Sequence, residues 1–576
     1  MHARRWLDLG AWFVLASLLG LVVTTAVHDR GMAVDDAYIT FRYADNLQQG
    51  LGLRWNADSP PCEGYTNFTY VLGLAALRAL GLAPLDGALL LANLSLVGIV
   101  ALAWSATRGA GRWRALALAP IVLLFATDTL EVHASRGLET CLFAFLASLT
   151  VTAQARLAAA AATRRRHAVA AAAAATLLFL TRPDGVLLAS CGFVAVAWLV
   201  RGERQRWRHL LLAVAVWLAA GLVYAAFKLA VFGYLLPNAF YMKSGGGRFQ
   251  GIDETLAFVR AFPLPLALLL LAAAASPCWW RPRTRPLGQH DAFAFLATVV
   301  TVAWLAYSAK IVHEIGYAFR FAWPLLPLVL LAACRSLSGI GARLEACRLG
   351  RAWPIAPVAL LLALSAALPQ QRALLAQLRR PPPHDPYTSM FLRLGEAIRD
   401  TGIAPQLTLY CTHAGATPWA AGAHHVDRAG LVDDGYCLRT PLRERARYEA
   451  NLRLDVISWH LFPAAPGATD FDGDGRASSS SYLRQWCLGL DPGMDTGLRK
   501  ALEGRDLGDR KRDLYTEMLF LREVATFVGE MRTGQRRWRT FVYVAKTSPH
   551  HDRLVQHLSR RVDIPAANVD FDGWPQ

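Results

Sequence analysis

Two adjacent carboxylates, Asp35 and Asp36, follow directly after the first long apolar segment of the chain. A carboxylate beside a bilayer is costly to desolvate, and such groups usually face a cavity where chemistry takes place. There one of them could act as a general base that removes the proton of a hydroxyl group. The alternative is that both only end a helix and stay hydrated, and spacing alone does not separate these interpretations. Neighbouring residues on a helix point about 100° apart, so we expect one of the two to face a substrate.

Cationic side chains stand at the ends of several later apolar segments, namely Arg182, Lys243 and Arg320. A buried phosphate group would be held by such residues through charge-assisted hydrogen bonds. Long cationic side chains also extend toward lipid headgroups, which is the alternative for each of them. Glu139 opens another apolar segment, where it could orient a sugar or interact with the dipole of the helix that it begins.

A short acidic run, Asp470, Asp472 and Asp474 with intervening Phe and Gly residues, matches the first half of a calcium-binding loop. Position twelve of such a loop is normally glutamate, whereas this chain has Ser481 there. The run therefore predicts either a calcium site or a solvated turn. A divalent cation (Ca, Mg or Mn) is the one cofactor that these residues suggest.

The composition is that of an integral membrane protein. Of the 576 residues, 54% are hydrophobic and only 18% are charged, and the mean hydropathy is +0.28. This is too apolar for an ordinary soluble enzyme. The net charge of +17 does not indicate a nucleic-acid partner, because the arginines cluster between apolar segments, as topology signals and contacts with anionic lipids do.

The apolar segments predict about eleven membrane-spanning helices by the criterion of about 20 residues per span. They lie near residues 6–27, 86–106, 114–129, 140–158, 168–182, 186–200, 209–232, 258–276, 292–309, 323–337 and 353–369. The shorter segment at 68–80 is expected to be an interfacial helix.

The first span is interpreted as a retained signal anchor, so residue 35 follows it on the outer face. Each loop that this topology places inside is then basic, including residues 164–166 and 335–351, as the positive-inside rule requires. The outward loops carry the residues named above.

The composition changes after residue 370, where a run of three prolines precedes about 190 mixed residues. We expect a transmembrane domain over 1–370, with its first external loop at 29–67, and an external domain over 371–576. Runs at 407–410, 455–459 and 540–544 predict strands, and 514–528 predicts a helix, which indicates an α/β or α+β module.

Several motifs occur in one order along most of the chain, at 35–43, 50–53, 63–67, 135–140, 181–185, 236–243, 317–321 and 427–433. With them the chain resembles polyprenyl-phosphate-dependent glycosyltransferases of the GT-C fold, in particular the mycobacterial terminal β-(1→2)-arabinofuranosyltransferase family. It departs from the family pattern before Arg320, where a Gly-Asp-Trp-like element is replaced by a segment that contains His313 and Glu314.

The resemblance implies roles for residues within these motifs. Asp35 is expected to be the general base, with Asp36 binding sugar hydroxyls or a metal, and Lys243 and Arg320 are expected to hold the donor phosphate. Further contacts with the substrates are expected from Tyr38, Arg42, Glu63, Tyr65, Asn67, Glu139, Asn238, Tyr241, His313 and Glu314.

The resemblance also implies an inverting transfer of a sugar, with arabinofuranose as a candidate, from polyprenyl phosphate to a cell-envelope glycan or glycoconjugate. The enzyme would lie in a bacterial inner membrane with its active site on the periplasmic side. A hexose donor of the mannose type is the second interpretation. The third, a transporter or export component, would predict inverted repeats and paired broken helices, which the sequence does not show.

Overall fold

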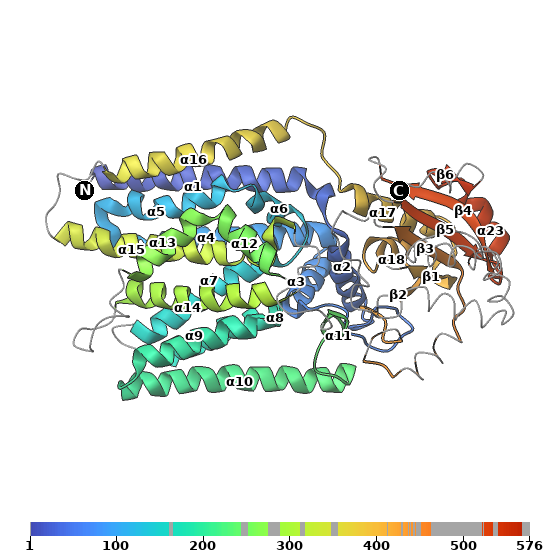
Figure 1. Cartoon of the computed structure of the whole chain (residues 1–576), viewed down its shortest axis with the longest axis horizontal. Helices are drawn as coiled ribbons and strands as arrows, with labels where there is room; N and C mark the ends of the chain where they lie inside the picture. The colour runs from blue at the N-terminus through green and yellow to red at the C-terminus, as the bar shows by residue number, and fades with distance from the viewer. Residues whose placement is uncertain are drawn as a thin grey trace, which may run out of the picture. The chain divides into compact units, whose positions relative to one another are not determined.

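The structure, a computed structural model, shows a helical protein with one mixed β-sheet in its C-terminal region (Figure 1). It describes residues 2–159, 165–243, 251–274, 288–311, 317–346, 355–411, 413–427, 430–435, 437, 439–441, 444, 448, 451–461, 521, 524–533 and 539–566.

The described chain divides into two compact units. Unit 1 comprises residues 1–33, 66–235 and 246–383, and unit 2 comprises 34–65, 236–245 and 384–576. The acidic pair at 35 and 36 thus packs with the C-terminal region, whereas Glu139, Arg182 and Arg320 belong to unit 1. The domain boundary predicted at residue 370 falls inside a helix that continues to Gln377. The apolar part of this segment ends before its helical backbone does.

Unit 1 is built from helices alone in its described residues. They are α1 (His2–His28), η1 (Arg30–Met32), α3 (Phe68–Ala79), α4 (Pro84–Ala106), η2 (Arg108–Trp113), α5 (Arg114–Val122), η3 (Leu123–Ala126), α6 (Thr129–Ser135), α7 (Thr140–Ala159), α8 (Arg165–Thr181), α9 (Gly185–Val200), α10 (Arg204–Phe232), α12 (Ile252–Ala261), α13 (Pro263–Ala274), α14 (Gln289–Lys310), η4 (Tyr317–Phe319), α15 (Leu325–Ala346) and α16 (Ile355–Gln377). Helix α7 packs against α4, α8, α9, α14 and α15, so it lies at the centre of the apolar core.

Every predicted membrane span corresponds to helix in the structure. Seven described helices, α1, α4, α7, α10, α14, α15 and α16, are long and apolar enough to cross a membrane. Two bent pairs of helices bring the number to nine if each pair is counted as one span, and α8 and α9, at the other two predicted spans, have only 17 and 16 residues. The chain is therefore a polytopic α-helical membrane protein. The expected interfacial helix is present as α3.

Two of the predicted spans are broken rather than straight. The chain bends by 67° between α5–η3 and α6, and by 83° between α12 and α13. The second break has a local cause, because Pro263 begins α13 and a proline disfavours helical backbone in the residue before it, Phe262.

Helix α15 extends further than its apolar segment predicts. The expected span ended at residue 337 and a basic loop was expected from 335, but the helix continues to Ala346. The loop prediction was wrong for these residues, since hydropathy reports the apolar part of a helix and not its end. Arg335 therefore lies within a helix.

Unit 2 contains a six-stranded sheet whose strands lie in the order β2-β1-β3-β5-β4-β6. Its elements are α2 (Asp35–Gln48), α11 (Asn238–Lys243), α17 (Pro386–Arg399), η6 (Ala404–Gln406), β1 (Thr408–Cys411), α18 (Ala416–Ala421), β2 (His424–Asp427), β3 (Val456–Leu461), β4 (Ala525–Arg532), β5 (Arg539–Ala545), α23 (His551–Leu558) and β6 (Ile564–Pro565). Strands β1, β2 and β3 are parallel, and the pairs from β3 to β6 are antiparallel. Helix α2 packs on α17 and α18.

The three predicted strands are confirmed as β1, β3 and β5. The prediction of helix over 514–528 is wrong at its end, where Ala525 begins β4, whose backbone hydrogen bonds pair it with β5. Tertiary pairing here overrides the local pattern. Cys62, Cys411 and Cys437 are free thiols in unit 2.

Candidate active site

The acidic pair forms the first turn of α2, in unit 2. Val34 precedes the helix with an extended backbone, and two carboxylates in a first turn interact favourably with the helix dipole. The backbone N–H of Ala416 donates a hydrogen bond of 2.7 Å to Asp35 Oδ1. A Cβ atom at Gly415 would lie 2.0 Å from the carbonyl oxygen of Asp35 and 2.6 Å from its Cγ. Only glycine at position 415 therefore allows the start of α18 to approach the Asp35 carboxyl so closely.

The Asp35 side chain is partly buried, and its pKa is raised to about 7. Loss of hydration is the largest cause, and the charges of Asp36 and Asp385 add to it, while the hydrogen bonds from Ala416 and Gly415 act in the opposite direction. The same carboxylates raise the pKa of the buried Tyr387 phenol, although burial is again the largest cause. A carboxyl with a pKa near 7 is suited to accept a proton at neutral pH.

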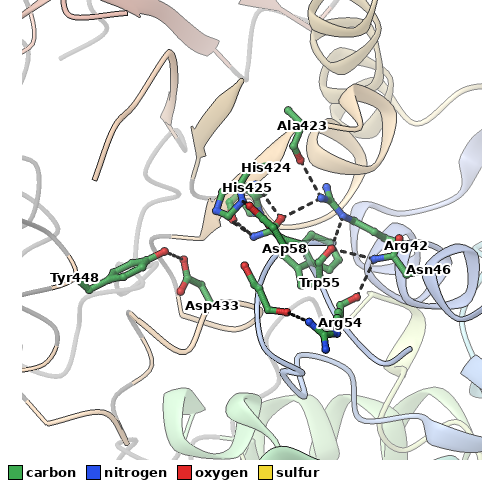
Figure 2. A network of polar contacts seen from close by, with 12 residues as sticks. Arg42, Asn46, Arg54, Trp55, Asp58, Ala423, His424, His425, Asp433 and Tyr448 are labelled. Carbon is green, nitrogen blue, oxygen red and sulfur yellow. Dashed lines mark hydrogen bonds and ion pairs between the residues drawn. The ribbon is translucent and has the colours of Figure 1, made fainter. Parts of the chain in front are cut away.

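Arg42, about two helix turns further along α2 than Asp35, is held by hydrogen bonds to protein groups (Figure 2). Its guanidinium donates to the backbone oxygens of Trp55 (2.9 Å), Pro418 (2.6 Å) and Ala423 (2.9 Å), and to Asn56 Oδ1 (3.1 Å). A guanidinium has five N–H donors, so these bonds use most of its capacity. The geometry favours a structural role in which Arg42 ties α2 to α18.

His425 on β2 continues this network. Trp55 Nε1 donates to His425 Nδ1 at 2.9 Å, and Asn56 exchanges two hydrogen bonds of 2.9 Å with the His425 backbone. Burial, with the positive charge of Arg42, lowers the pKa of His425 well below its usual value, so the ring is neutral and can accept at Nδ1. The segment around residues 55 and 56 is thereby fixed to the sheet of unit 2.

Unit 2 also contains a buried carboxyl at Asp433, the last residue of the sequence motif at 427–433. Tyr448 donates to its Oδ2 at 2.7 Å (Figure 2). The Gly435 N–H donates to its Oδ1 at 2.8 Å. Burial raises the pKa of Asp433 to about 7, against the effect of these bonds.

In unit 1, Glu139 stands directly before α7 and is almost fully buried. Asn67 Nδ2 donates to its Oε2 at 3.0 Å, and Arg182 Nη1 and Arg320 Nη2 lie 3.8 and 3.7 Å from its Oε1. Burial alone would raise the pKa of Glu139, but the two arginines outweigh it and lower the pKa. The cluster therefore holds an ionised carboxylate between two guanidinium groups.

The two arginines of this cluster differ in their other contacts. Arg182 donates to both oxygens of Asp184, at 3.2 and 2.7 Å, and its guanidinium lies 5.0 Å from the Phe143 ring. Arg320 follows η4 and lies 5.8 Å from the ring of Phe321. Their distances to Glu139 are those of ion pairs and exceed hydrogen-bonding length.

Comparison with known proteins finds likeness in structure alone. No family model and no curated protein sequence matches the chain. Its structure is similar to ArnT from Cupriavidus metallidurans bound to undecaprenyl phosphate, with a TM-score of 0.56 and 15% identity over 93% of this chain and 98% of that one. For ArnT in the apo state the TM-score is 0.57, at 16% identity over 96% and 99% of the two chains. The chain has the GT-C fold.

A mycobacterial arabinofuranosyltransferase, AftD, is also found, with a TM-score of 0.45 and 15% identity over 95% of this chain and 40% of that one. The GT-C fold predicted from the sequence is confirmed by the likeness to ArnT, which covers both units.

Within this GT-C fold the remaining predicted site residues divide between the units. The Tyr38 ring packs in a tilted arrangement against Trp419, with ring centroids 5.0 Å apart, and Tyr65 packs edge-on against Tyr43, with centroids 4.8 Å apart. In the same unit the Asn238 N–H donates to the Glu63 carbonyl at 3.0 Å.

The Asn238 side chain donates to Asp434 Oδ1 at 2.9 Å and accepts from Arg439 Nε at 3.2 Å. Tyr241, on the same short helix α11, packs edge-on against Phe240 at 5.8 Å. Lys243 is the last residue of α11. Asn67 is the one predicted site residue of the first external loop that lies in unit 1, where it donates to Glu139.

The predictions at His313, Glu314, Asp470, Asp472 and Asp474 lie outside the described residues. Among the residues that the structure does describe, no group of three or more His, Cys, Asp or Glu side chains is arranged to hold a metal ion.

Sequence reasoning missed three features of these clusters. Arg182 was considered as a possible phosphate ligand or a cation that extends toward lipid headgroups, whereas the structure places it between α8 and α9, where it shares Glu139 with Arg320. Gly415 was not singled out, because no local pattern marks it, and Asp433 was noted only as the last residue of the motif at 427–433, without a role. The contact between Gly415 and Asp35 joins residues 380 positions apart in sequence and is visible only in the folded chain.

Proposed function

We propose that the chain is a membrane glycosyltransferase that transfers a sugar from a polyprenyl phosphate to a cell-envelope acceptor on the periplasmic side, with inversion. One observation carries the proposal: the Asp35 carboxyl is fixed by the Ala416 N–H and has a pKa of about 7. A base in that range can remove the proton of an acceptor hydroxyl at neutral pH. A fold alone does not establish a function, so the proposal rests on this site together with the motif resemblance.

In the proposed reaction the acceptor oxygen attacks the anomeric carbon while its proton passes to Asp35. The bond between that carbon and the phosphate oxygen breaks, and polyprenyl phosphate leaves with the electron pair. Negative charge grows on the phosphate in the transition state, where preorganised cations contribute most. Arg320 and Lys243 have that role, as their motifs suggest.

Two further residues have supporting roles in the proposal. The ionised Glu139 holds Arg320 and Arg182 in place through its two ion pairs. Asp36, next to the base, binds sugar hydroxyls or a divalent cation. The solved ArnT structure with undecaprenyl phosphate supports a polyprenyl-phosphate ligand for a chain of this fold.

The test is a transfer assay with two chemically defined donors. Membranes that contain the chain are incubated with polyprenyl-phosphate arabinofuranose or polyprenyl-phosphate mannose, and the released polyprenyl phosphate and the sugar incorporated into membrane glycans are measured. Membranes without the chain serve as the control. We expect chain-dependent consumption of the arabinofuranose donor. Consumption of the mannose donor would establish the hexose alternative, and consumption of neither would contradict this choice of donors.

A further inference from the structure

A hollow on the solvent side of helix α23, in unit 2, is lined by cationic and polar side chains. Its volume is about 330 Å³, and its lining residues are Arg553, Gln556, His557, Arg560 and Arg561. The first four stand at positions i, i+3, i+4 and i+7, which places them along one face of the helix and of the turn after it. The buried Leu554 and Leu558 lie on another face, and α23 packs on β4 and β5. The apolar residues of the helix are thus used in the fold, and its basic face is left to solvent.

The hollow has an excess of positive charge. Arg561 has a counter-ion, because its Nη2 lies 3.3 Å from Asp400 Oδ2. Arg553 donates to the backbone oxygen of Thr401, and Arg560 is exposed. No carboxylate in the described part of the chain forms an ion pair with Arg553 or Arg560. A guanidinium stays protonated in proteins. Two of the three arginine charges are therefore available to an anionic partner.

Contacts with the end of α17 hold part of the lining in place. His557 Nε2 lies 3.1 Å from the backbone oxygen of Ala397, so this nitrogen carries the proton and donates it. In a neutral ring Nδ1 is then an acceptor. The exposed Gln556 adds an amide that can both donate and accept. Beside the arginines the hollow thus has groups that suit the hydroxyls of a sugar.

The spacing of the available charges indicates the kind of partner. Arg553 and Arg560 are seven residues apart, about 10 Å along a helix. One phosphate or carboxylate group cannot bridge that distance, whereas a chain with repeated anionic groups can. A helix that binds a lipid surface presents apolar side chains for insertion. None lines this hollow, because Leu554 and Leu558 are buried.

We propose that this hollow binds an anionic polysaccharide, whose carboxylate or phosphate groups pair with Arg553 and Arg560 and whose hydroxyls contact Gln556 and His557. Guanidinium groups recognise both kinds of anion with charge-assisted hydrogen bonds. The hollow contains none of the residues assigned to glycosyl transfer. Binding can therefore be measured, and can fail, independently of the proposed function.

The test measures binding to the full chain in nanodiscs of neutral phosphatidylcholine by isothermal titration calorimetry. The probes are oligogalacturonate, phosphorylated dextran, neutral dextran and inorganic phosphate. The variants are Arg560→Gln and the Arg553→Gln, Arg560→Gln double variant. Arg453→Gln, at an exposed arginine of unit 2 that does not line the hollow, is the matched control.

We expect wild type and Arg453→Gln to bind at least one of the two anionic glycans, with an affinity that falls as salt is added. Arg560→Gln should lose about 5-fold in affinity and the double variant about 25-fold, since each removes exposed charge pairs. Inorganic phosphate should bind far more weakly, because one ion engages one cation. Neutral dextran should not bind.

Equal affinity of wild type and the double variant for the anionic glycans would overturn the proposal, and so would equal binding of neutral dextran. Binding to phosphatidylglycerol vesicles that is lost in Arg560→Gln, without binding to either anionic glycan, would assign the surface to a lipid instead. Arg560→Gln removes no hydrogen bond within the described chain, and its thermal midpoint of unfolding should equal that of wild type. If a variant does not fold, wild type decides: the absence of binding to both anionic glycans would refute the site.

Discussion

At the scale of single residues, the environment of Asp35 determines the pH range in which the proposed base can act. With a pKa of about 7, its carboxyl is protonated in mildly acidic solution and ionised above pH 7. We expect kcat/KM for glycosyl transfer to rise tenfold per pH unit below about pH 6 and to level off above about pH 8. A pH–rate profile from 5 to 9 measures this. A profile that is flat below pH 7 would assign the proton transfer to another group.

The raised pKa of Asp35 also makes the free energy of unfolding depend on pH. The Asp35 carboxyl binds its proton more tightly in the folded chain, with a pKa of about 7, than at its ordinary value of 3.8. Its contribution to the free energy of unfolding therefore falls as the pH rises from about 4 to 7 and stays constant above that. Asp35→Asn removes this contribution, so that variant should be at least as stable as wild type at pH 8.

A further prediction is that Arg320 contacts the phosphate of the lipid donor. Arg320→Ala removes one charge-assisted contact, which corresponds to about 1.5–3 kcal/mol, and should raise the KM for the lipid donor or lower turnover by about 10- to 100-fold. Arg260→Ala, at an exposed arginine of α12, is the matched control and should behave as wild type. Steady-state kinetics of purified protein at varied donor concentration provide the measurement. An unchanged donor dependence in Arg320→Ala would remove this residue from the phosphate site.

At the scale of elements, the start of α18 positions the acidic start of α2. A Cβ atom at residue 415 would overlap the Asp35 backbone at 2.0 Å, so Gly415→Ala must displace either the loop or the carboxyl. We expect turnover to fall by about 10- to 100-fold and the acidic limb of the pH–rate profile to shift, since the Ala416 hydrogen bond lowers the pKa of Asp35. Gly221→Ala on α10, where no atom lies within 4 Å of the new Cβ, is the control. Wild-type turnover and pH profile in Gly415→Ala would show that this contact does not position the base.

Sequence patterns predict the elements well where one local signal dominates. Apolar length located the seven described helices that are long enough to cross a membrane, and β-rich runs located β1, β3 and β5. The break before Pro263 could have been predicted from the proline itself, but the bend before Thr129 has no such marker. Strand β4 was missed because its hydrogen bonds to β5 outweigh its local pattern.

The candidate site was predictable as a set of motifs, not as a set of contacts. The charged side chains of Asp35, Glu139 and Arg320 suggested a general base, a carboxylate that orients a sugar and a phosphate ligand. Two of the hydrogen bonds that occupy Arg42, those to Pro418 and Ala423, join residues 376 and 381 positions apart, and no spacing rule reports them. Burial, which sets the pKa of Asp35, is likewise a property of the folded unit.

At the scale of the whole molecule, the topology prediction places residue 165 inside the cell and residues 371–576 outside. It rests on the basic loops and the positive-inside rule. Single cysteines at positions 165 and 500, in a background without native thiols, are labelled in intact cells with a membrane-impermeant thiol reagent. We expect labelling at position 500 and protection at position 165, with both sites labelled after the cells are lysed. The reverse pattern would invert the topology and place Asp35 on the cytoplasmic side.

The central claim, that Asp35 is the general base of a glycosyl transfer, is tested most directly by replacing the two carboxylates one at a time. Asp35→Asn keeps shape and hydrogen bonding but cannot accept a proton, so turnover should fall by about 10²- to 10⁴-fold with donor binding little changed. Asp36→Asn should be milder, and excess divalent cation should partly rescue it if Asp36 binds a metal. Near-normal sugar transfer by the Asp35→Asn, Asp36→Asn double variant, at wild-type protein levels in membranes, would contradict the account.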